Sequence, residues 1–142
     1  MSLSEILLTP QKRIRVNGGD VLHALKSSDP SYAGFGEAYF SWISSGAIKA
    51  WKKHTKMTMN ILVPLGAIKF VFCEIQDYEI KDLRVEVISQ SNYMRLTVPP
   101  GIWFGFQGLD SKPSLILNIA NILHDPHEVE RLKQHEINYI WS

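Results

Sequence analysis

Short apolar segments alternate with turn residues along most of the chain, and helical periodicity is rare. Runs rich in β-branched and aromatic residues, closed by Gly, Pro, Asn or Asp, are typical of the strands of a sandwich or barrel. The pattern therefore predicts an all-β domain. The expected strands lie within residues 13–16, 21–26, 37–44, 47–64, 68–75, 85–88, 92–98, 102–109 and 114–123.

One helix is predicted near the C-terminus. Asp125 suits the N-cap, Pro126 the first helical position and Glu128 the third, which together form an Asp-capped version of the capping box. We expect this helix to run over about residues 126–135. The tail, 137–141, would then be a strand or an ordered segment packed on the barrel.

Composition narrows the class of protein. A chain of 142 residues with 45% hydrophobic residues fits a single domain, 1–142, with a core of its own. A net charge of +1 favours neither nucleic acid nor an anionic membrane as a partner. No run approaches the ~20 apolar residues of a membrane span, and residues 6–8 are too short an apolar run for a signal peptide. A single cysteine, Cys73, suits a reducing compartment, so we expect a cytoplasmic protein.

A basic cluster stands out in the middle of the chain. It contains Lys49, Lys52, Lys53, His54 and Lys56, with no acidic residue among them. On a strand, Lys52, His54 and Lys56 share one face, whereas Lys49 joins them only through a bulge or a turn. If this face lines the mouth of a barrel, it presents cations to a pyrophosphate or an enolate oxygen. The alternative is a solvated face of an edge strand.

The spacing of these residues resembles the two motifs of the cupin superfamily. The first motif reads Gly46-x5-Lys52-x-His54 and the second Pro99-x-Gly101-x-x-Phe104, with Gly66 between them. The wider frame is similar to the branch containing dTDP-4-dehydrorhamnose 3,5-epimerase and the dTDP-sugar 3,4-ketoisomerases. It consists of 35–41 (FGEAYFS), 46–54 (GAIKAWKKH), 98–109 (VPPGIWFGFQGL) and 120–130 (ANILHDPHEVE).

This resemblance implies a fold, a function and an assembly. The fold would be a cupin-type jelly-roll β-barrel with one short C-terminal helix. The function would be epimerisation or isomerisation of a nucleotide-linked 4-keto-6-deoxysugar in surface polysaccharide (lipopolysaccharide or O-antigen) biosynthesis. The assembly would be a homodimer formed by strand exchange.

The resemblance also implies roles for individual residues. Lys52 matches the catalytic His of the epimerases and Lys49 their Arg, while His54 matches the second His of the ketoisomerases. His124 falls near the Tyr that serves as acid. We therefore expect His54 to be the base, Lys52 the donor to the developing oxyanion and His124 the acid.

A second set of residues is expected to bind the substrate. Each has a structural alternative: surface ion pairing for the charged members, a sheet-end or bulge contact for the amide, and core or interface packing for the aromatic ring. The set comprises Lys49, Lys56, Glu37, Arg95, Asn118 and Trp103.

Metal binding is not expected. The resemblance implies that a metal-binding member would hold its ion with three His and one Glu, but here Lys52 and Phe104 occupy two of the His positions. No Glu occurs between His54 and Gly66. One imidazole does not hold a divalent ion, so we predict neither a metal nor an organic cofactor.

Two hypotheses of different classes remain. In the first, the protein is an enzyme that moves a proton on a nucleotide-linked keto sugar. In the second, it is a non-catalytic cupin that binds a sugar nucleotide or a protein partner. The retained basic strand favours the first, and the replacement of a motif histidine by Phe104 favours the second.

Overall fold

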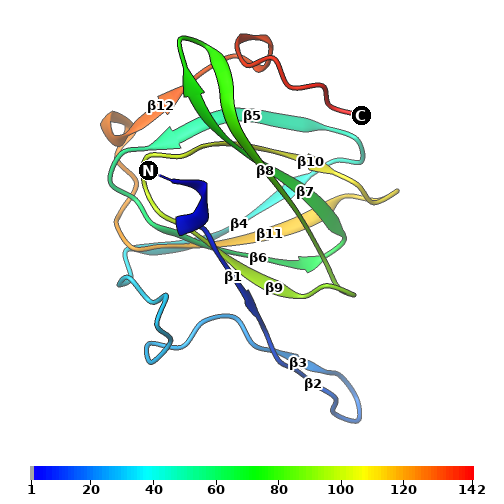
Figure 1. The fold of residues 1–142 in the computed structure, drawn as a ribbon. Coiled ribbons are helices and arrows are strands. Elements are labelled where there is room, and N and C mark those ends of the chain that lie inside the picture. Colours follow the sequence, from blue (N-terminus) through cyan, green and yellow to red (C-terminus); the bar gives the residue numbers. More distant parts are fainter. Residues whose placement is uncertain (1) are drawn as a thin grey trace.

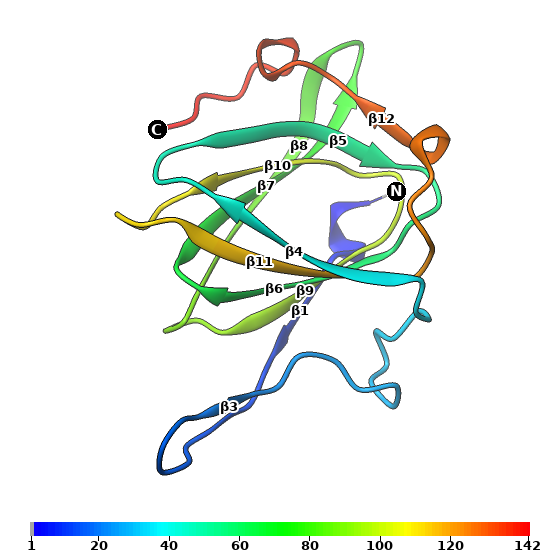
Figure 2. The same cartoon turned by 180° about the vertical axis from the view of Figure 1, so that it is seen from behind.

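The computed structural model describes residues 2–142, and almost all of its regular structure is β. Ten strands form two five-stranded antiparallel sheets that face each other (Figures 1 and 2). In spatial order, the first sheet contains β1 (Leu7–Pro10), β9 (Met94–Val98), β6 (Met59–Leu65), β11 (Ser114–Ala120) and β4 (Glu37–Ile43). The second contains β12 (Val129–Arg131), β5 (Ile48–His54), β10 (Trp103–Gly108), β7 (Ala67–Gln76) and β8 (Glu79–Ser89).

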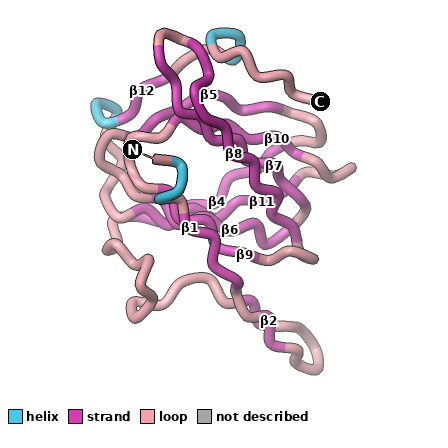
Figure 3. The backbone as a smooth tube through the Cα atoms, in the orientation of Figure 1, coloured by secondary structure: helices cyan, strands magenta, loops and turns pink. Residues whose placement is uncertain are grey.

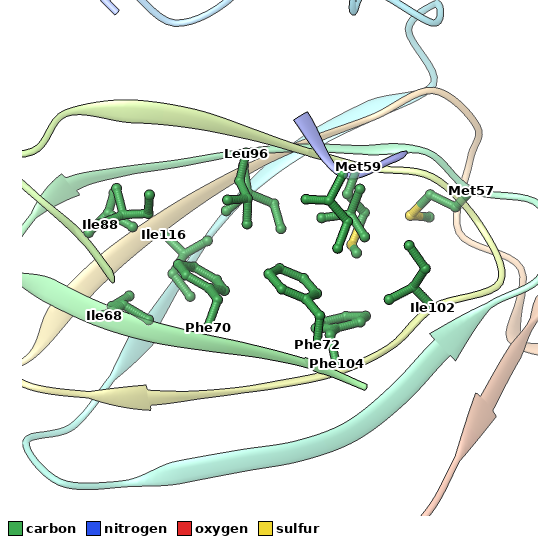
Figure 4. Packing of buried hydrophobic residues seen from close by; sticks show 14 of the residues in the cluster. Met57, Met59, Ile68, Phe70, Phe72, Ile88, Leu96, Ile102, Phe104 and Ile116 are labelled. Atoms are coloured by element: carbon green, nitrogen blue, oxygen red, sulfur yellow. The ribbon is translucent and has the colours of Figure 1, made fainter. Parts of the chain in front are cut away.

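Alternation along the strands places the core between the two sheets. On β11, for example, Ser114, Ile116, Asn118 and Ala120 are buried while the residues between them are partly exposed. Figure 4 shows side chains of both sheets meeting in this space, among them Phe70 and Phe72 of β7 and Leu96 of β9. The all-β fold predicted from the apolar pattern is confirmed.

A second apolar cluster covers the outer face of the second sheet. Trp51, Val71 and Cys73 form it together with Ile137 of the C-terminal tail. The Trp51 indole Nε1 donates to the backbone oxygen of Gln134 at 3.2 Å. The tail is therefore ordered and packed on the barrel, as expected, although it forms no strand.

The predicted C-terminal helix is wrong in its extent. Asp125 is an N-cap, and its carboxylate accepts from the backbone N–H of His127 at 2.9 Å. However, Pro126–Glu128 form only one 3-10 turn, η2, and β12 follows at once. The reason is that the backbone of β12 pairs with β5, which an α-helix through residue 135 would prevent.

The remaining helical segments are equally short. They are the 3-10 turns η1 (Leu3–Glu5) and η3 (Gln134–Glu136), drawn in cyan in Figure 3. Across residues 2–142, no helix is long and apolar enough to cross a membrane.

An arm extends from the N-terminal part of the barrel. The short strands β2 (Arg13–Ile14) and β3 (Val21–Leu22) pair as a hairpin that projects away from both sheets (Figures 1 and 2). The chain then returns and is fastened to the first sheet by Arg95 of β9. This buried guanidinium donates to Ala24 O at 2.9 Å, to Ser31 Oγ at 2.6 Å and to Asp29 Oδ2 at 3.1 Å.

We expect Arg95→Met to lower the free energy of unfolding by about 2–3 kcal/mol, because buried hydrogen bonds from a charged donor are lost. Urea denaturation measures this loss, and limited proteolysis should show faster cleavage between residues 23 and 35. Arg15→Met is the control, since the exposed Arg15 pairs with Asp20 at the surface and its loss should change stability by less than about 0.5 kcal/mol. Wild-type stability in Arg95→Met would contradict this account of the arm.

Candidate active site

A pocket of about 370 Å³ opens between the two sheets. Strands β5 and β12 of the second sheet supply a basic wall. Strands β4 and β11 of the first sheet supply the opposite wall, which has uncharged polar side chains and one acid, Glu37. The floor is apolar and consists of core residues, among them Met57, Met59, Phe70 and Phe104. The pocket is thus polar on two sides and hydrophobic at depth, a composition typical of small-molecule sites.

The basic wall depends on a bulge in β5. Phe104 of β10 lies opposite Lys52, but the next residue, Gly105, lies opposite Ala50, so Trp51 has no partner on β10. A bulge of this kind shifts the alternation of side chains by one residue. Lys49 and Lys52 consequently line the same pocket. Lys49 was expected to join Lys52 through a bulge or a turn, and the structure shows the bulge.

The cations of this wall have little negative charge near them. Within residues 2–142, none of Lys49, Lys52 and Arg131 forms an ion pair with a carboxylate. Partial desolvation lowers the pKa of Lys52, and the nearby charges of Arg131 and Lys49 lower it further. A second hollow of about 290 Å³ adjoins these three residues. An anion bound there would relieve the mutual repulsion of the cations.

His54, at the end of β5, is held by a buried carboxylate. Its Nδ1 is hydrogen-bonded to Oε1 of Glu128, whose side chain is hidden in the turn before β12. Oε2 of Glu128 accepts from the backbone N–H groups of Lys56 and Met57, each at 3.2 Å. The His54 ring also stacks on Phe104, with 6.0 Å between ring centroids and 19° between planes.

The charge state of Glu128 fixes the tautomer of His54. Burial of Glu128, which is 3% exposed, acts to raise the pKa of its carboxyl. The hydrogen bonds from His54 and from the two backbone N–H groups outweigh burial and lower this pKa below its usual value of 4.5. Glu128 is therefore a carboxylate near neutral pH and can only accept, so Nδ1 of His54 carries a proton. Nε2 is left as the ring nitrogen that can take up a proton.

The opposite wall carries polar side chains from two paired strands. Glu37, Tyr39 and Ser41 lie on β4, and Asn118 lies on β11 opposite Tyr39 in register. Asn118 Nδ2 donates to the Tyr39 hydroxyl oxygen at 2.9 Å. This wall faces the cations across the pocket, so positive charge lies on one side of the site and neutral or acidic side chains lie on the other.

Most of the residues predicted from the sequence come together in this pocket. The ones that line it are His54, Lys52, His124, Lys49, Glu37 and Asn118. Their individual roles remain predictions. Two further residues, Glu128 and Arg131, were not singled out as site residues from the sequence. Glu128 was read only as a helix-cap residue, since no local pattern indicates a partner that lies 74 positions away in the chain.

Three of the expected substrate-binding residues lie elsewhere. Arg95 is on the outer face of the first sheet, where it fastens the arm. Trp103 belongs to the apolar cluster outside the second sheet, with the Lys53 ammonium 5.2 Å from its ring centroid. Lys56 lies beyond the end of β5 at His54, so the strand alternation that was assumed for it no longer holds, and its exposed side chain does not line the pocket.

Among residues 2–142, no group of three or more His, Cys, Asp or Glu side chains is arranged to hold a metal ion.

The two facing antiparallel sheets and the pocket between them make this a cupin-type jelly-roll barrel. A dTDP sugar isomerase from Desulfovibrio desulfuricans G20 superposes with a TM-score of 0.89 at 33% identity, over 96% of this chain and 90% of that one. At this identity and coverage, the chain belongs to the dTDP-sugar isomerase family. No protein-family model and no curated protein sequence matches the chain.

Two more distant structures share the fold. The sugar 3,4-ketoisomerase QdtA of Thermoanaerobacterium thermosaccharolyticum, in complex with TDP, has a TM-score of 0.77 at 15% identity, over 96% of this chain and 95% of that one. The dTDP-6-deoxy-D-glucose-3,5-epimerase RmlC of Legionella pneumophila Philadelphia 1, in complex with dTDP-4-keto-L-rhamnose, has a TM-score of 0.80 at 13% identity. That match covers 99% of this chain and 80% of the epimerase.

We expect Glu128→Gln to lower the free energy of unfolding by about 2 kcal/mol at pH 7, because a buried charged acceptor is lost. The stabilisation from a carboxyl whose pKa is lowered on folding is present above its unfolded-state pKa and is lost as the pH falls through the folded-state pKa. The difference between wild type and variant should therefore shrink below about pH 4.5. Urea denaturation between pH 7 and pH 3 measures it.

Glu130→Gln is the matched control for this experiment. Glu130 pairs with Lys53 at 2.9 Å on the exposed side of β12, where an ion pair contributes little. A difference between wild type and Glu128→Gln that did not change with pH would contradict the ionised state assigned to Glu128.

Proposed function

We propose that this protein moves a proton on a carbon beside the keto group of a nucleotide-linked 4-keto-6-deoxysugar, as an epimerase or ketoisomerase. The observation that carries the proposal is the His54–Glu128 pair inside a pocket with an unneutralised basic wall. Family membership supports it, as do the TDP and the keto sugar bound in the related ketoisomerase and epimerase.

The proposed chemistry begins with His54. Its Nε2 takes a proton from the carbon next to the carbonyl, and the electrons of that C–H bond move to the carbonyl oxygen as an enolate. Glu128 stabilises the imidazolium that forms. Lys52, two residues away on the same wall, donates to the enolate oxygen, where a positive charge has most effect in a partly desolvated site. His124, which lines the same pocket, returns a proton to the carbon or to the oxygen.

The diphosphate of the substrate is proposed to lie in the hollow beside the bulge of β5. Lys49 and Arg131 would bind it there, and the rings of Phe104 and Phe106 also line the hollow, with Lys52 at its border toward the sugar. The cations suit phosphate oxygens, and the rings exclude water around them. Ligand binding there should raise the pKa of Lys52 again, because a negative charge favours the protonated amine.

The biological setting follows from the proposed substrate. Nucleotide-linked deoxysugars suit a role in surface polysaccharide (lipopolysaccharide or O-antigen) biosynthesis, and we propose a cytoplasmic location. The single cysteine supports this location, since Cys73 is buried, has no disulfide partner, and has a pKa that burial raises to about 12. A thiol of this kind packs in the protein and is unreactive in a reducing compartment.

A non-catalytic sugar-nucleotide-binding protein is the second candidate function. It is favoured by Phe104, a hydrophobic ring at a position where the cupin motif has a histidine. Such a protein would bind the nucleotide sugar through the same basic wall but would exchange no protons.

Solvent exchange distinguishes the two candidates. We expect the wild type to exchange hydrogen for deuterium beside the keto group of dTDP-4-keto-6-deoxyglucose in D₂O, as followed by NMR. His54→Gln should lower the exchange rate by about 10²–10⁴-fold, the usual contribution of a general base. Lys53→Gln should exchange at the wild-type rate, because Lys53 lies on the opposite face of β5 and pairs with Glu130. Binding without exchange in the wild type would favour the non-catalytic alternative.

We also propose that the protein is a homodimer. Support comes from the outer face of β4 at the edge of the first sheet, where Phe40 and Trp42 are 63% and 56% exposed. Their register partners on β11, Leu117 and Leu115, extend this apolar surface. An exposed aromatic surface on an edge strand is typical of a protein interface.

Sedimentation velocity tests this assembly. We expect the wild type to sediment as a dimer and Trp42→Lys as a monomer, because a buried lysine without a partner opposes association. Leu83→Lys is the control, since Leu83 is also exposed but lies on β8, the edge strand at the far side of the second sheet. A wild type that is monomeric at micromolar concentration would overturn the proposal.

A further inference from the structure

Two polar atoms on the wall opposite the cations are buried without a hydrogen-bond partner. They are Oε1 of Glu37 and Oδ1 of Asn118, and both side chains line the pocket. Asn118 is only 4% exposed, so bulk water does not solvate its carboxamide. Buried acceptors are normally paired, and each unpaired one is unfavourable for folding. Two unpaired acceptors in side chains that line one pocket point to donors on the ligand.

The sheet fixes the positions of these two acceptors. Asn118 lies opposite Tyr39 and Ala120 opposite Glu37, so Glu37 and Asn118 are diagonal neighbours on one face of the β4–β11 pair. Diagonal neighbours are about 7–8 Å apart at the backbone, and their side chains can converge. The Asn118 carboxamide is oriented because its Nδ2 already donates to the Tyr39 hydroxyl. The oxygen is thereby left as the free group.

The rest of the pocket limits which part of a ligand reaches this wall. The cations that suit the diphosphate line β5 and β12, on the other side of the pocket. The floor is apolar and suits a methyl group. In a 4-keto-6-deoxyhexose, the groups that remain as donors are the hydroxyls at C2 and C3, which are adjacent on the ring.

We propose that Glu37 and Asn118 are specificity residues that accept hydrogen bonds from the C2 and C3 hydroxyls of the sugar. This inference rests on the proposed function and specifies its substrate class as keto sugars that retain this vicinal hydroxyl pair. A site with unpaired buried acceptors discriminates strongly against an analogue that lacks the donor. Sugars that are deoxygenated at C2 are therefore poor ligands.

Isothermal titration calorimetry with three ligands tests the proposal: dTDP, dTDP-4-keto-6-deoxyglucose and the 2-deoxy analogue of that keto sugar. In the wild type, we expect the 2-deoxy analogue to bind about tenfold more weakly than the parent sugar, the effect of one lost hydrogen bond. Asn118→Leu and Glu37→Met should each weaken binding of the parent sugar by about tenfold. Asn118→Leu should leave the affinity for dTDP unchanged.

Gln107→Leu is the matched control. Gln107 on β10 also has a buried, unpaired amide oxygen and is 8% exposed, but it does not line the pocket. Gln107→Leu should maintain or raise Tm, because it replaces an unpaired buried amide oxygen by an apolar side chain of similar size. Asn118→Leu also removes the hydrogen bond to the Tyr39 hydroxyl, so its Tm should fall by about 5 °C or less, the effect of one hydrogen bond. Only Asn118→Leu should lose sugar affinity, and a folded Asn118→Leu with undiminished sugar affinity would show that Asn118 is merely structural.

The outcomes separate this inference from the function on which it rests. Equal wild-type affinity for the parent sugar and the 2-deoxy analogue would overturn the inference, whether or not the variants fold. Undiminished binding of the parent sugar by Asn118→Leu and Glu37→Met would also overturn it, with sugar-nucleotide binding intact. A wild type that binds neither dTDP nor the keto sugar would overturn the proposed function, and the inference with it.

Discussion

The buried carboxylate of Glu128 joins the C-terminal segment to the end of β5, and the organisation of the pocket depends on this contact. A charged group removed from water is unfavourable unless every lone pair finds a donor. Here one oxygen is hydrogen-bonded to His54 and the other accepts from two backbone N–H groups in the turn after β5. These bonds hold the turn, the imidazole and β12 in one arrangement. The position of Arg131 beside Lys52 follows from it, because Arg131 pairs with Lys52 in register.

The same contact explains how the site differs from that of a metal-binding cupin. The cupin motifs usually carry histidines where this chain has Lys52 and Phe104, and the imidazole of His54 remains. Glu128 orients that imidazole from one side, and the Phe104 ring contacts it from the other. In the proposed mechanism, the positive charge beside the carbonyl comes from Lys52. The cupin-type barrel is retained, and the positive charge of its pocket comes from side chains on β5 and β12.

The sequence predicted the strands and much of the pocket for a physical reason. Alternation and turn residues are local, so β4, β7, β10 and β11 were recognisable, and strand parity was enough to assign Lys52 and His54 to one face. The predictions that were wrong are those that depend on contacts between segments far apart in the sequence. The Asp125 cap was read correctly, but the pairing of Val129–Arg131 with β5 was not visible locally. Arg95 and Trp103 have the chemistry of ligand contacts, yet the arm and the tail cover them on the outer faces.

The bulge at Trp51 gives β5 one residue more than its partner strand needs. Because one residue of β5 has no partner on β10, Lys49 and Lys52 lie on the same side although three positions separate them. Deletion of that residue would restore the plain alternation and leave Lys49 opposite Phe106 and Lys52 opposite Phe104, so both lysines would still face the pocket. What would be lost is the Trp51 side chain, which packs on Ile137 and donates to Gln134 O. Within this family, a single-codon deletion in β5 is thus a route by which the C-terminal tail can be released in one evolutionary step while the charge of the pocket persists.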